Sequence, residues 1–383
     1  MTIAELHANE ELRAHEFPVV REKVFLAHAG VCPLPRRVTA AMETYIHACA
    51  RGDQEHALPA EVITQTRALA AQLIGGKPTE IALVGPTSLA LSYIAGGLKL
   101  KKNKTVFTYL DDYPSNVYPW MKLADRGIPV QLLNVSALGR IRARDIVGQI
   151  DEQTQLVALA SCHYVAGFRA EIEQIAQELK RRGILFCVDA IQTLGAFPTT
   201  VQNIDFLAAD AHKWMLGPCA AGTMFVREEV QDQLRPIVHG WHNIRCPNFV
   251  ADEEMTYKPD ARRYEAGTAN LIGLVGLRAC LELLLEVGIE NIARELLRKR
   301  NWLVPAIKEK GYTVLHADVP AENQSGIVTF HKPGSDMADL HAKMEAAGIV
   351  TSLRFDRAGN KYIRLSPHFY NTDPELQRVV DLL

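Results

Sequence analysis

The sequence lacks several patterns, and each absence removes a class of protein. It has no CxxC pair, no apolar run near the roughly 20 residues that a membrane span needs, and no surplus of basic residues. Its 42 Lys and Arg residues face 44 Asp and Glu residues, a net charge of −2. We therefore expect no structural zinc site, no membrane partner and no general binding to nucleic acid. Residues 1–17 are polar, and they predict no secretory signal.

Cysteine is also scarce, with seven residues in a chain of 383, and the odd number does not suggest a disulfide framework. This usage is typical of a reduced, cytoplasmic protein, and no cluster of residues predicts a metal ion. The length fits two domains, and a hydrophobic content of 48% is enough for a sizeable core.

Helical patterns alternate with short apolar runs between about residues 56 and 226. The expected strands are 80–84, 104–109, 130–135, 155–160, 184–189, 204–210 and 222–226, and the expected helices are 60–74, 88–98, 115–126 and 171–182. Crossovers of this kind predict a mostly parallel sheet that is covered on both faces.

A loop-like stretch at 227–262 separates this region from two long helical patterns, at 271–288 and 290–311. A second alternation then runs to the end of the chain and predicts a smaller α/β unit. The expected organisation is an N-terminal segment, 1–45, that packs on both domains, a large domain, 46–262, and a small C-terminal domain, 263–383.

Polar residues follow several of the expected strands, and ligands of parallel sheets bind at that edge. Thr87 and Ser88 begin a helix after the first strand, where they either bind an anion or simply cap the helix. Lys213 follows the strand 204–210; it is either a buried nucleophile or an ordinary charged loop residue.

Two further strand ends leave the same choice open. Asp189 ends a buried strand. Its carboxylate either pairs with a cation, such as a protonated pyridine nitrogen, or caps the next helix. Tyr113 either stacks on a planar ligand or lies in a surface turn. A dinucleotide-binding dehydrogenase would need GxGxxG after its first strand, and no such motif follows it here.

The segments VDAIQTLG (188–195), DAHKWMLGP (210–218) and EAGT (265–268) resemble the class V aminotransferase and cysteine desulfurase superfamily of fold-type I pyridoxal-phosphate enzymes. The resemblance runs from FLAHAGVCPLP (25–35) to YIRLSPHFYNT (362–372). It implies an α/β fold with a mostly parallel seven-stranded sheet in the large domain and a smaller C-terminal α/β domain. It also implies pyridoxal 5′-phosphate as cofactor and a homodimer.

The resemblance implies a role for each strand-end residue. Lys213 would hold the cofactor as a Schiff base and move the Cα proton, Asp189 would keep the pyridine nitrogen protonated, and Tyr113 would stack on the ring. Gln192 would donate to the phenolic oxygen. The phosphate would meet Thr87, Ser88, His212 and, across a dimer interface, Gly267 and Thr268. Asp210 stands where relatives often have a hydroxyl residue, and a carboxylate there would repel phosphate unless it faces away.

On the substrate side, Arg364 matches the arginine that clamps an α-carboxylate. His28 is a candidate acid or base lining the substrate pocket, or else an ordinary loop residue. Ala29, Tyr164 and Trp241 are further candidates for substrate binding.

The desulfurases accept sulfur on a loop cysteine, and this sequence has no cysteine after Cys280. Cys32, Cys162 and Cys219 are not at that position. HYVAG (163–167), Gly240–Trp241 and the SPHFYNT ending resemble kynureninase and isopenicillin-N-epimerase-like branches instead.

The expected activity is therefore formation of a Cα carbanion on a small amino-acid substrate, followed by β-elimination at a C–S bond or by epimerisation. Cysteine desulfurase or selenocysteine lyase, kynureninase-type and aminotransferase activities stay open, as does a non-catalytic binding protein.

Overall fold

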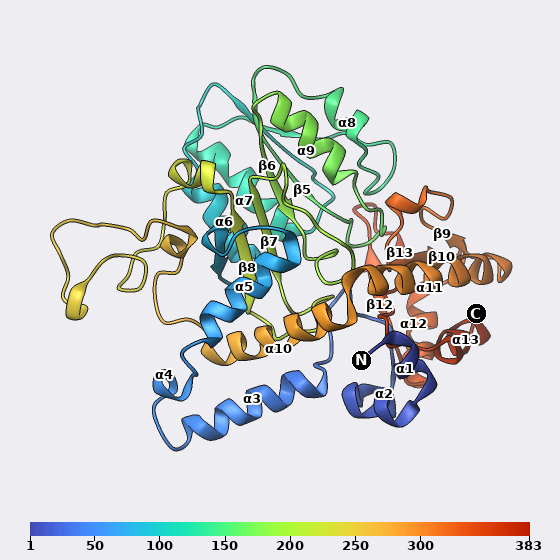
Figure 1. Ribbon diagram of the computed structural model, residues 1–383. Coiled ribbons are helices and arrows are strands. Elements are labelled where there is room, and N and C mark those ends of the chain that lie inside the picture. The colour runs from blue at the N-terminus through green and yellow to red at the C-terminus, as the bar shows by residue number, and fades with distance from the viewer.

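A seven-stranded sheet forms the centre of the larger part of the protein in the computed structural model, which describes residues 1–383 (Figure 1). Its spatial order is β2-β8-β7-β6-β5-β3-β4. The strands are β2 (Ile81–Leu83), β3 (Thr105–Thr108), β4 (Val130–Leu132), β5 (Thr154–Ala160), β6 (Leu185–Asp189), β7 (Phe206–Asp210) and β8 (Gly222–Val226). The strands from β4 to β7 pair in parallel, and β8 is antiparallel to both β7 and β2. The prediction of a mostly parallel sheet is confirmed.

Both faces of this sheet are buried. Successive side chains of a strand point to opposite faces, so Phe186 and Val188 join one apolar cluster and Cys187 joins another. The covering helices are α5 (Val62–Ile74), α6 (Thr87–Gly97), α9 (Ile172–Arg181) and α10 (Leu271–Val287). Two-sided burial explains why these strands are nearly continuous apolar runs.

The helix expected at 115–126 is wrong as a single element. Residues 114–126 form three short helical segments, η3 (Pro114–Asn116), α7 (Tyr118–Met121) and η4 (Lys122–Arg126). Pro119 lies in the first turn of α7, where its missing N–H is tolerated, but it cannot continue a helix from the preceding residues. The residues are helical, but Pro114 and Pro119 prevent one continuous helix.

A four-stranded antiparallel sheet, in the order β12-β13-β10-β9, forms the centre of the smaller part. Its strands are β9 (Thr313–Val314), β10 (Val328–His331), β12 (Ser352–Phe355) and β13 (Lys361–Leu365). They pack with α11 (Ile289–Glu309), α12 (Met337–Ala346) and α13 (Asp373–Asp381) around an apolar cluster of 17 buried residues.

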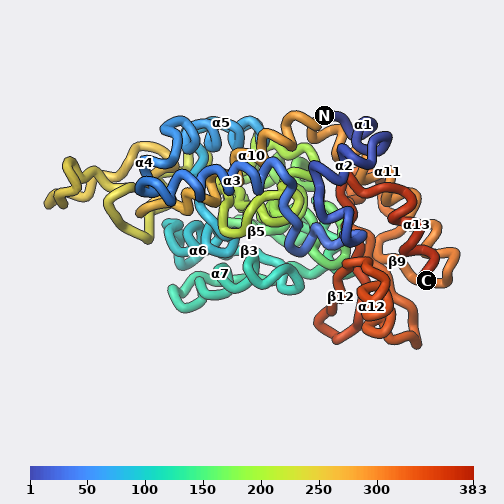
Figure 2. Tube along the Cα trace, turned by 90° about the horizontal axis from the view of Figure 1, so that it is seen from below, coloured from blue at the N-terminus to red at the C-terminus, as the bar shows by residue number.

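The N-terminal segment contacts both parts. Strand β1 (Val24–Phe25) pairs in parallel with β11 (Ile349–Val350) of the smaller part. The Cys32 amide donates to the His212 carbonyl in the larger part at 2.8 Å. Helix α3 (Arg36–Cys49) runs along α10 (Figure 2). The segment thus lies against both parts, and the division of the chain at residues 45 and 262 stays a prediction.

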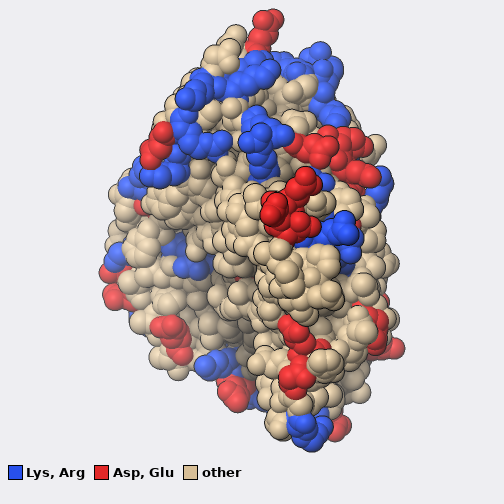
Figure 3. Space-filling model, turned by 90° about the vertical axis from the view of Figure 1, so that its left-hand side faces the viewer, with Lys and Arg blue, Asp and Glu red and all other residues tan.

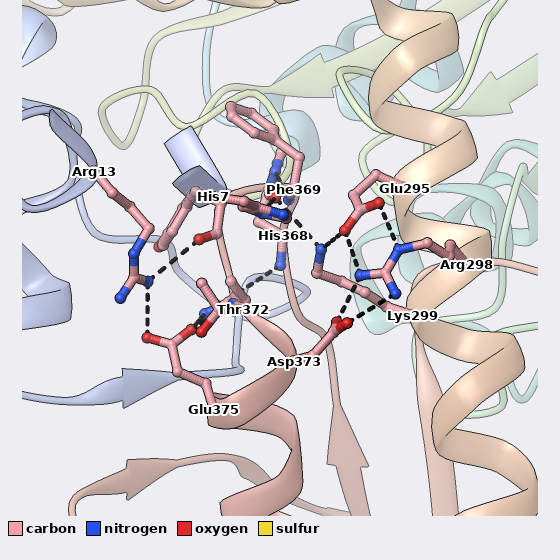
Figure 4. A network of polar contacts seen from close by, with 12 residues as sticks. His7, Arg13, Glu295, Arg298, Lys299, His368, Phe369, Thr372, Asp373 and Glu375 are labelled. Atoms are coloured by element: carbon pink, nitrogen blue, oxygen red, sulfur yellow. Dashed lines mark hydrogen bonds and ion pairs between the residues drawn. The ribbon is translucent and has the colours of Figure 1, made fainter. Parts of the chain in front are cut away.

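Helices α1 (Ile3–Ala8) and α2 (Glu10–Glu16) are tied to the C-terminal part by a polar network (Figure 4). Arg13 donates to Glu375 at 2.9 Å, and His7 lies 2.9 Å from the Phe369 carbonyl. The remaining short elements are α4 (Gln54–Ala57), α8 (Ala143–Val147), η1 (Pro18–Arg21), η2 (Pro78–Glu80), η5 (Glu228–Gln233), η6 (Pro247–Phe249), η7 (Ala261–Tyr264) and η8 (Ala321–Asn323). None of the helices is long and apolar enough to traverse a bilayer.

Candidate active site

Lys213 lies just beyond the carboxyl end of β7, at the centre of the candidate site. Its side chain is buried, and its Nζ has neither a hydrogen bond nor an ion pair within the chain. Burial lowers the pKa of this amine to about 8; the charge of Asp189 opposes that shift, and Arg364 and Arg354 add to it. An amine that loses its proton near neutral pH is a nucleophile, as the sequence predicts for this residue.

Asp189 ends β6, and its carboxylate is buried close to Lys213. Burial raises its pKa, while the Ile191 amide, which donates to Oδ1 at 3.0 Å, and the charge of Lys213 lower it. Its second oxygen has no partner within the chain. A buried carboxylate with a free oxygen fits a cationic nitrogen, the partner that we expected for it.

A second buried carboxylate, Asp112, lies near Asp189 and was not singled out from the sequence. Burial raises its pKa to about 7, and the charge of Asp189 contributes to this shift. Asp112 accepts hydrogen bonds from the Tyr113 and Ala160 amides and from Asn116. These bonds fix the turn that carries Tyr113, so Asp112 is a positioning residue for that ring.

Tyr113 is placed as a stacking residue would be. Its side chain is 44% exposed, and the Lys213 Nζ lies 5.1 Å from the centre of its ring. Tyr164 meets it edge to face, at 5.2 Å and 76° between the ring planes. A planar ligand attached near Lys213 would therefore find an aromatic ring beside it.

Gln192 is held from both sides of its amide group. Its Nε2 donates to the Ala29 carbonyl at 3.1 Å, and its Oε1 accepts from the Trp214 indole at 2.9 Å. One N–H of the amide is left for a ligand, which fits the expected donor role. Ala29 takes part through its backbone and so connects the N-terminal segment to the site.

The N-terminus of α6 lies at the end of the candidate site where an anion is expected. Thr87 and Ser88 lie in the first turn, where backbone N–H groups have no partner inside the helix, and no side chain caps them. The Thr87 hydroxyl accepts from the Asp210 amide at 2.9 Å. This bond joins the end of β7 to the start of α6.

The carboxylate of Asp210 is held by groups of its own chain. It accepts from the amides of Ala211, Ala220 and Ala221, and it lies 2.7 Å from Nδ1 of His212. These partners offset its charge and so weaken the repulsion of a phosphate that a carboxylate would cause. Asp210 instead orients His212, so the structure gives it a positioning role rather than a direct contact.

Gly267 and Thr268 are exposed and line a cleft of about 260 Å³ beside Gly85 and Gly222. The neighbouring Glu265 is buried and pairs with Arg67 at 2.5 Å. Its Oε1 also accepts from the Leu83 amide at 2.8 Å. The Glu of the EAGT motif thus fixes the motif to β2, a structural role that its spacing alone did not reveal.

Arg364 lies on β13 and is fully buried without a carboxylate partner. It donates to the Tyr164 carbonyl at 2.6 Å and to the Ser352 hydroxyl at 3.4 Å, and its Nε has no partner. Burial, together with the charge of Arg354, lowers its pKa to about 9. A buried guanidinium with a free donor fits a carboxylate that arrives with the substrate.

The surroundings of His28 argue against the acid or base role that we expected. The ring is buried, with Nδ1 2.9 Å from the Ser366 carbonyl and Nε2 2.7 Å from the Tyr370 hydroxyl. Burial lowers its pKa to about 4. Both nitrogens are occupied, so His28 joins the N-terminal segment to the C-terminal one.

Trp241 lies on a projecting segment, residues 236–260, rather than beside Lys213 (Figure 1). Its aromatic neighbours are His242 and Phe249, and its side chain is partly exposed. Its expected contact with the substrate stays a prediction.

The arrangement as a whole matches a known family. The family model described as Aminotransferase class-V matches residues 24–379. The chain belongs to this family. It is a pyridoxal-phosphate-dependent enzyme, and the free Lys213 amine, the free Asp189 oxygen and the unpartnered Arg364 Nε fit that cofactor and its amino-acid substrates.

Individual relatives support the same assignment. A probable cysteine desulfurase of Methanothermobacter thermautotrophicus is 28% identical over 98% of this chain and 97% of its own length. The apo structure of a cysteine desulfurase from Thermococcus onnurineus NA1 superposes with a TM-score of 0.87 at 25% identity, covering 97% of this chain and 96% of the other. The structure of the cystine C–S lyase C-DES with cysteine persulfide has a TM-score of 0.85 at 20% identity, over 95% and 98% of the two chains. The last likeness concerns the fold alone.

Proposed function

We propose that this enzyme cleaves the Cβ–S bond of a sulfur-containing α-amino acid by β-elimination. Lys213 would hold the cofactor through Nζ, Asp189 would face its pyridine nitrogen, and the start of α6 with His212 would bind its phosphate. Once bound, pyridoxal phosphate supplies an electron sink for negative charge at the substrate Cα. Arg364 would bind the substrate carboxylate through its guanidinium group, which has no carboxylate partner in the chain.

In the reaction, Lys213 Nζ takes the proton from the substrate Cα. The electron pair of the Cα–H bond forms a Cα=Cβ bond, and the Cβ–S bond breaks with its electron pair on sulfur. The sulfur fragment leaves as a thiolate or persulfide and is protonated in solvent. Water then converts the remaining enamine to pyruvate and ammonia. The low pKa of Lys213, about 8, suits an amine that must both accept and return a proton.

The observation that carries this proposal is the absence of a thiol on the loop between β12 and β13. Residues 356–360 read Asp-Arg-Ala-Gly-Asn, and Arg357 closes this loop onto Asp111 at 2.5 Å. A sulfur-accepting cysteine of the usual kind is therefore missing, and the sulfur would leave with the departing fragment.

The buried cysteines near the site are poor substitutes for that thiol. Burial raises the pKa of Cys32 to about 12 and that of Cys162 to about 11. Because the thiolate is the reactive form, both are weak nucleophiles at neutral pH. Cys219 is exposed on the loop after Lys213, and it can be tested directly by substitution.

We also propose a homodimer that works in the cytoplasm. The projecting segment, residues 236–260, exposes several apolar side chains: Ile237, Val238, Trp241, Phe249, Val250 and Met255. Figure 3 views the side from which it projects, and much of that face is uncharged. A second copy would cover these residues and bring its own groups to the cleft of Gly267 and Thr268. All seven cysteines are free, as expected in a reducing compartment.

The test is product analysis of the purified holoenzyme in heavy water with L-cysteine and L-cystine. Equal amounts of pyruvate and ammonia are expected. Alanine in place of pyruvate would instead identify a desulfurase, and deuterium at Cα of an intact substrate an epimerase. A Cys219→Ser variant should retain pyruvate formation, whereas loss of product in this variant would show that a protein thiol takes part.

A further inference from the structure

The candidate site contains a second arginine that the reaction outlined above does not use. Ser352 of β12 lies opposite Arg364 of β13, so Arg354, two residues further along β12, projects from the same face of the sheet. An ideal Cβ placed on Gly30 would lie 3.6 Å from Nη2 of Arg364 and 3.7 Å from Nη2 of Arg354. The two guanidinium groups therefore flank one point of the N-terminal segment.

Arg354 has no carboxylate partner in the chain. Its one hydrogen bond runs from Nη1 to the carbonyl of its neighbour Leu353, at 3.3 Å. Its guanidinium is half-buried, and burial lowers its pKa, with the hydroxyls of Tyr113 and Tyr164 as the facing titratable groups that act against this shift. By contrast, Arg357 on the next loop pairs with Asp111.

Three cationic side chains thus face the space beside Tyr113: Lys213, Arg354 and Arg364. Both arginines lower the pKa of Lys213, which places all three within electrostatic reach of each other. Asp189 offsets one of these charges. A substrate α-carboxylate on Arg364 offsets a second, and the charge of Arg354 is left without a counterpart. Unpaired, partly desolvated cations are costly unless a ligand brings the opposite charge.

We propose that Arg354 binds a second anionic group, carried on the side chain of the substrate. In combination with the proposed C–S cleavage, on which this inference rests, the substrate class is a sulfur amino acid whose departing fragment bears a carboxylate. Arg364 then binds the α-carboxylate, and Arg354 binds the carboxylate of the departing fragment. The closeness of both groups to Gly30 limits the substrate to a short spacer between the two anions.

A matched pair of ligands tests this assignment. S-carboxymethyl-L-cysteine carries the second carboxylate, and S-carbamoylmethyl-L-cysteine replaces it with a neutral amide of nearly the same shape. The holoenzyme is titrated with each by calorimetry and by cofactor absorbance, for the wild type and for Arg354→Gln and Arg354→Lys. These readouts report affinity whether or not the ligand is turned over.

The wild type should bind the acid at least about tenfold more tightly than the amide, as expected for one charge-assisted hydrogen bond. In Arg354→Gln this preference should fall to near unity, through weaker binding of the acid alone, and Arg354→Lys should keep part of it. Equal affinities in the wild type would overturn the inference. So would an equal loss for both ligands in Arg354→Gln, since Arg354 would then belong to the α-carboxylate clamp.

The inference and the proposed reaction fail in different ways. A preference for the acid that depends on Arg354, without pyruvate from either ligand, would sink the C–S lyase proposal and keep the anion subsite. Pyruvate from both ligands, without any preference for the acid, would keep the C–S lyase proposal and overturn the anion subsite. Arg354→Lys keeps the positive charge. If it keeps part of the preference for the acid, the loss in Arg354→Gln comes from the missing charge and not from misfolding.

Discussion

Two buried lysines of this chain share an electrostatic property and differ in what surrounds them. Burial lowers the pKa of both Lys213 and Lys299 to about 8. Lys299 lies on α11 and contacts Glu295 one turn earlier, as well as the Phe369 carbonyl at 3.4 Å (Figure 4). Glu295 also pairs with Arg298 at 2.8 Å. The Nζ of Lys213 has no such partner.

The comparison shows that a shifted pKa does not by itself identify a reactive group. The Lys299 amine donates to Glu295 and to the Phe369 carbonyl, and it thereby connects α11 to the C-terminal segment. The Lys213 amine faces a carboxylate and two guanidinium groups across a space, without a bond to any of them. A functional amine needs both a lowered pKa and an N–H group without a partner. Lys299 meets only the first condition, whereas Lys213 meets both.

The largest difference is expected from removing each amine in turn. Lys213→Ala should abolish cofactor absorbance in the purified protein and lower turnover by at least about 10³-fold, because the attachment point and the proton acceptor are lost together. Lys299→Met should leave the absorbance per protein chain unchanged. Spectra of both variants, purified side by side, check this. Retention of turnover in Lys213→Ala would refute the site assignment.

The next difference concerns Arg364, which is buried like Lys299 but has an unpartnered Nε. Arg364→Gln should lower kcat/KM by about 30- to 1000-fold, as expected when one partner of a buried charged pair is truncated. Cofactor absorbance should stay at the wild-type level, because Arg364 meets the substrate. Steady-state kinetics beside the absorbance spectrum check this. Loss of the cofactor in this variant would place Arg364 in the cofactor site instead.

Site residues could be predicted from the sequence where a strand end coincides with a motif. Prediction was weaker where segments distant in the chain determine what a side chain contacts. Asp189 and Lys213 lie at the ends of the neighbouring strands β6 and β7, because the ends of parallel strands meet at one edge of the sheet. Arg364 lies on an antiparallel strand of the smaller sheet, and only the family resemblance pointed to it. The choice left open for His28 could not be made from the sequence, because its partners, Ser366 and Tyr370, come from the far end of the chain. No periodicity shows that the C-terminal segment folds back over it.

Side-chain direction was the second limit. The sequence left open where the Asp210 carboxylate points, and only the loop at 217–221 decides, because its amides bind the carboxylate. Arg354 had no motif, and its importance follows from its place on the strand beside Arg364. The fold itself was easier, since alternating helices and apolar runs leave few arrangements of a parallel sheet.

A smaller effect, on stability alone, is expected from the saturated lysine. Lys299→Met leaves the partly buried Glu295 with Arg298 as its remaining partner, so the loss should be below the 3–5 kcal/mol of a fully broken buried pair, at roughly 2 kcal/mol. Urea unfolding of the variant, monitored by circular dichroism, measures it. A Lys299→Met, Glu295→Gln double variant should recover part of the loss. An unchanged unfolding midpoint would show that this pair contributes nothing.

The dependence of stability on pH separates the two amines in the protein freed of cofactor. The folded pKa of Lys213, about 8, lies below the ordinary lysine pKa of 10.5, so the unfolded chain binds more protons between these values. The unfavourable contribution of Lys213 is thus fully present below pH 8 and disappears as the pH rises toward 10.5. Lys213→Met should therefore stabilise the cofactor-free protein, by up to about 3 kcal/mol below pH 8 and by progressively less at higher pH.

Urea unfolding of this variant and the wild type at pH 7, 8, 9 and 10 measures that difference. Lys299→Met serves as the matched control. Its amine has a similarly lowered pKa, so loss of the charge brings a similar gain, but the substitution also breaks the contact with Glu295, and the loss of roughly 2 kcal/mol given above is the expected net result. It should destabilise the protein where Lys213→Met stabilises it. Opposite signs at pH 7 would show that burial without a partner, rather than burial itself, distinguishes the reactive lysine. If Lys213→Met also destabilised the protein at pH 7, the amine of Lys213 would have to be held by the chain much as that of Lys299 is.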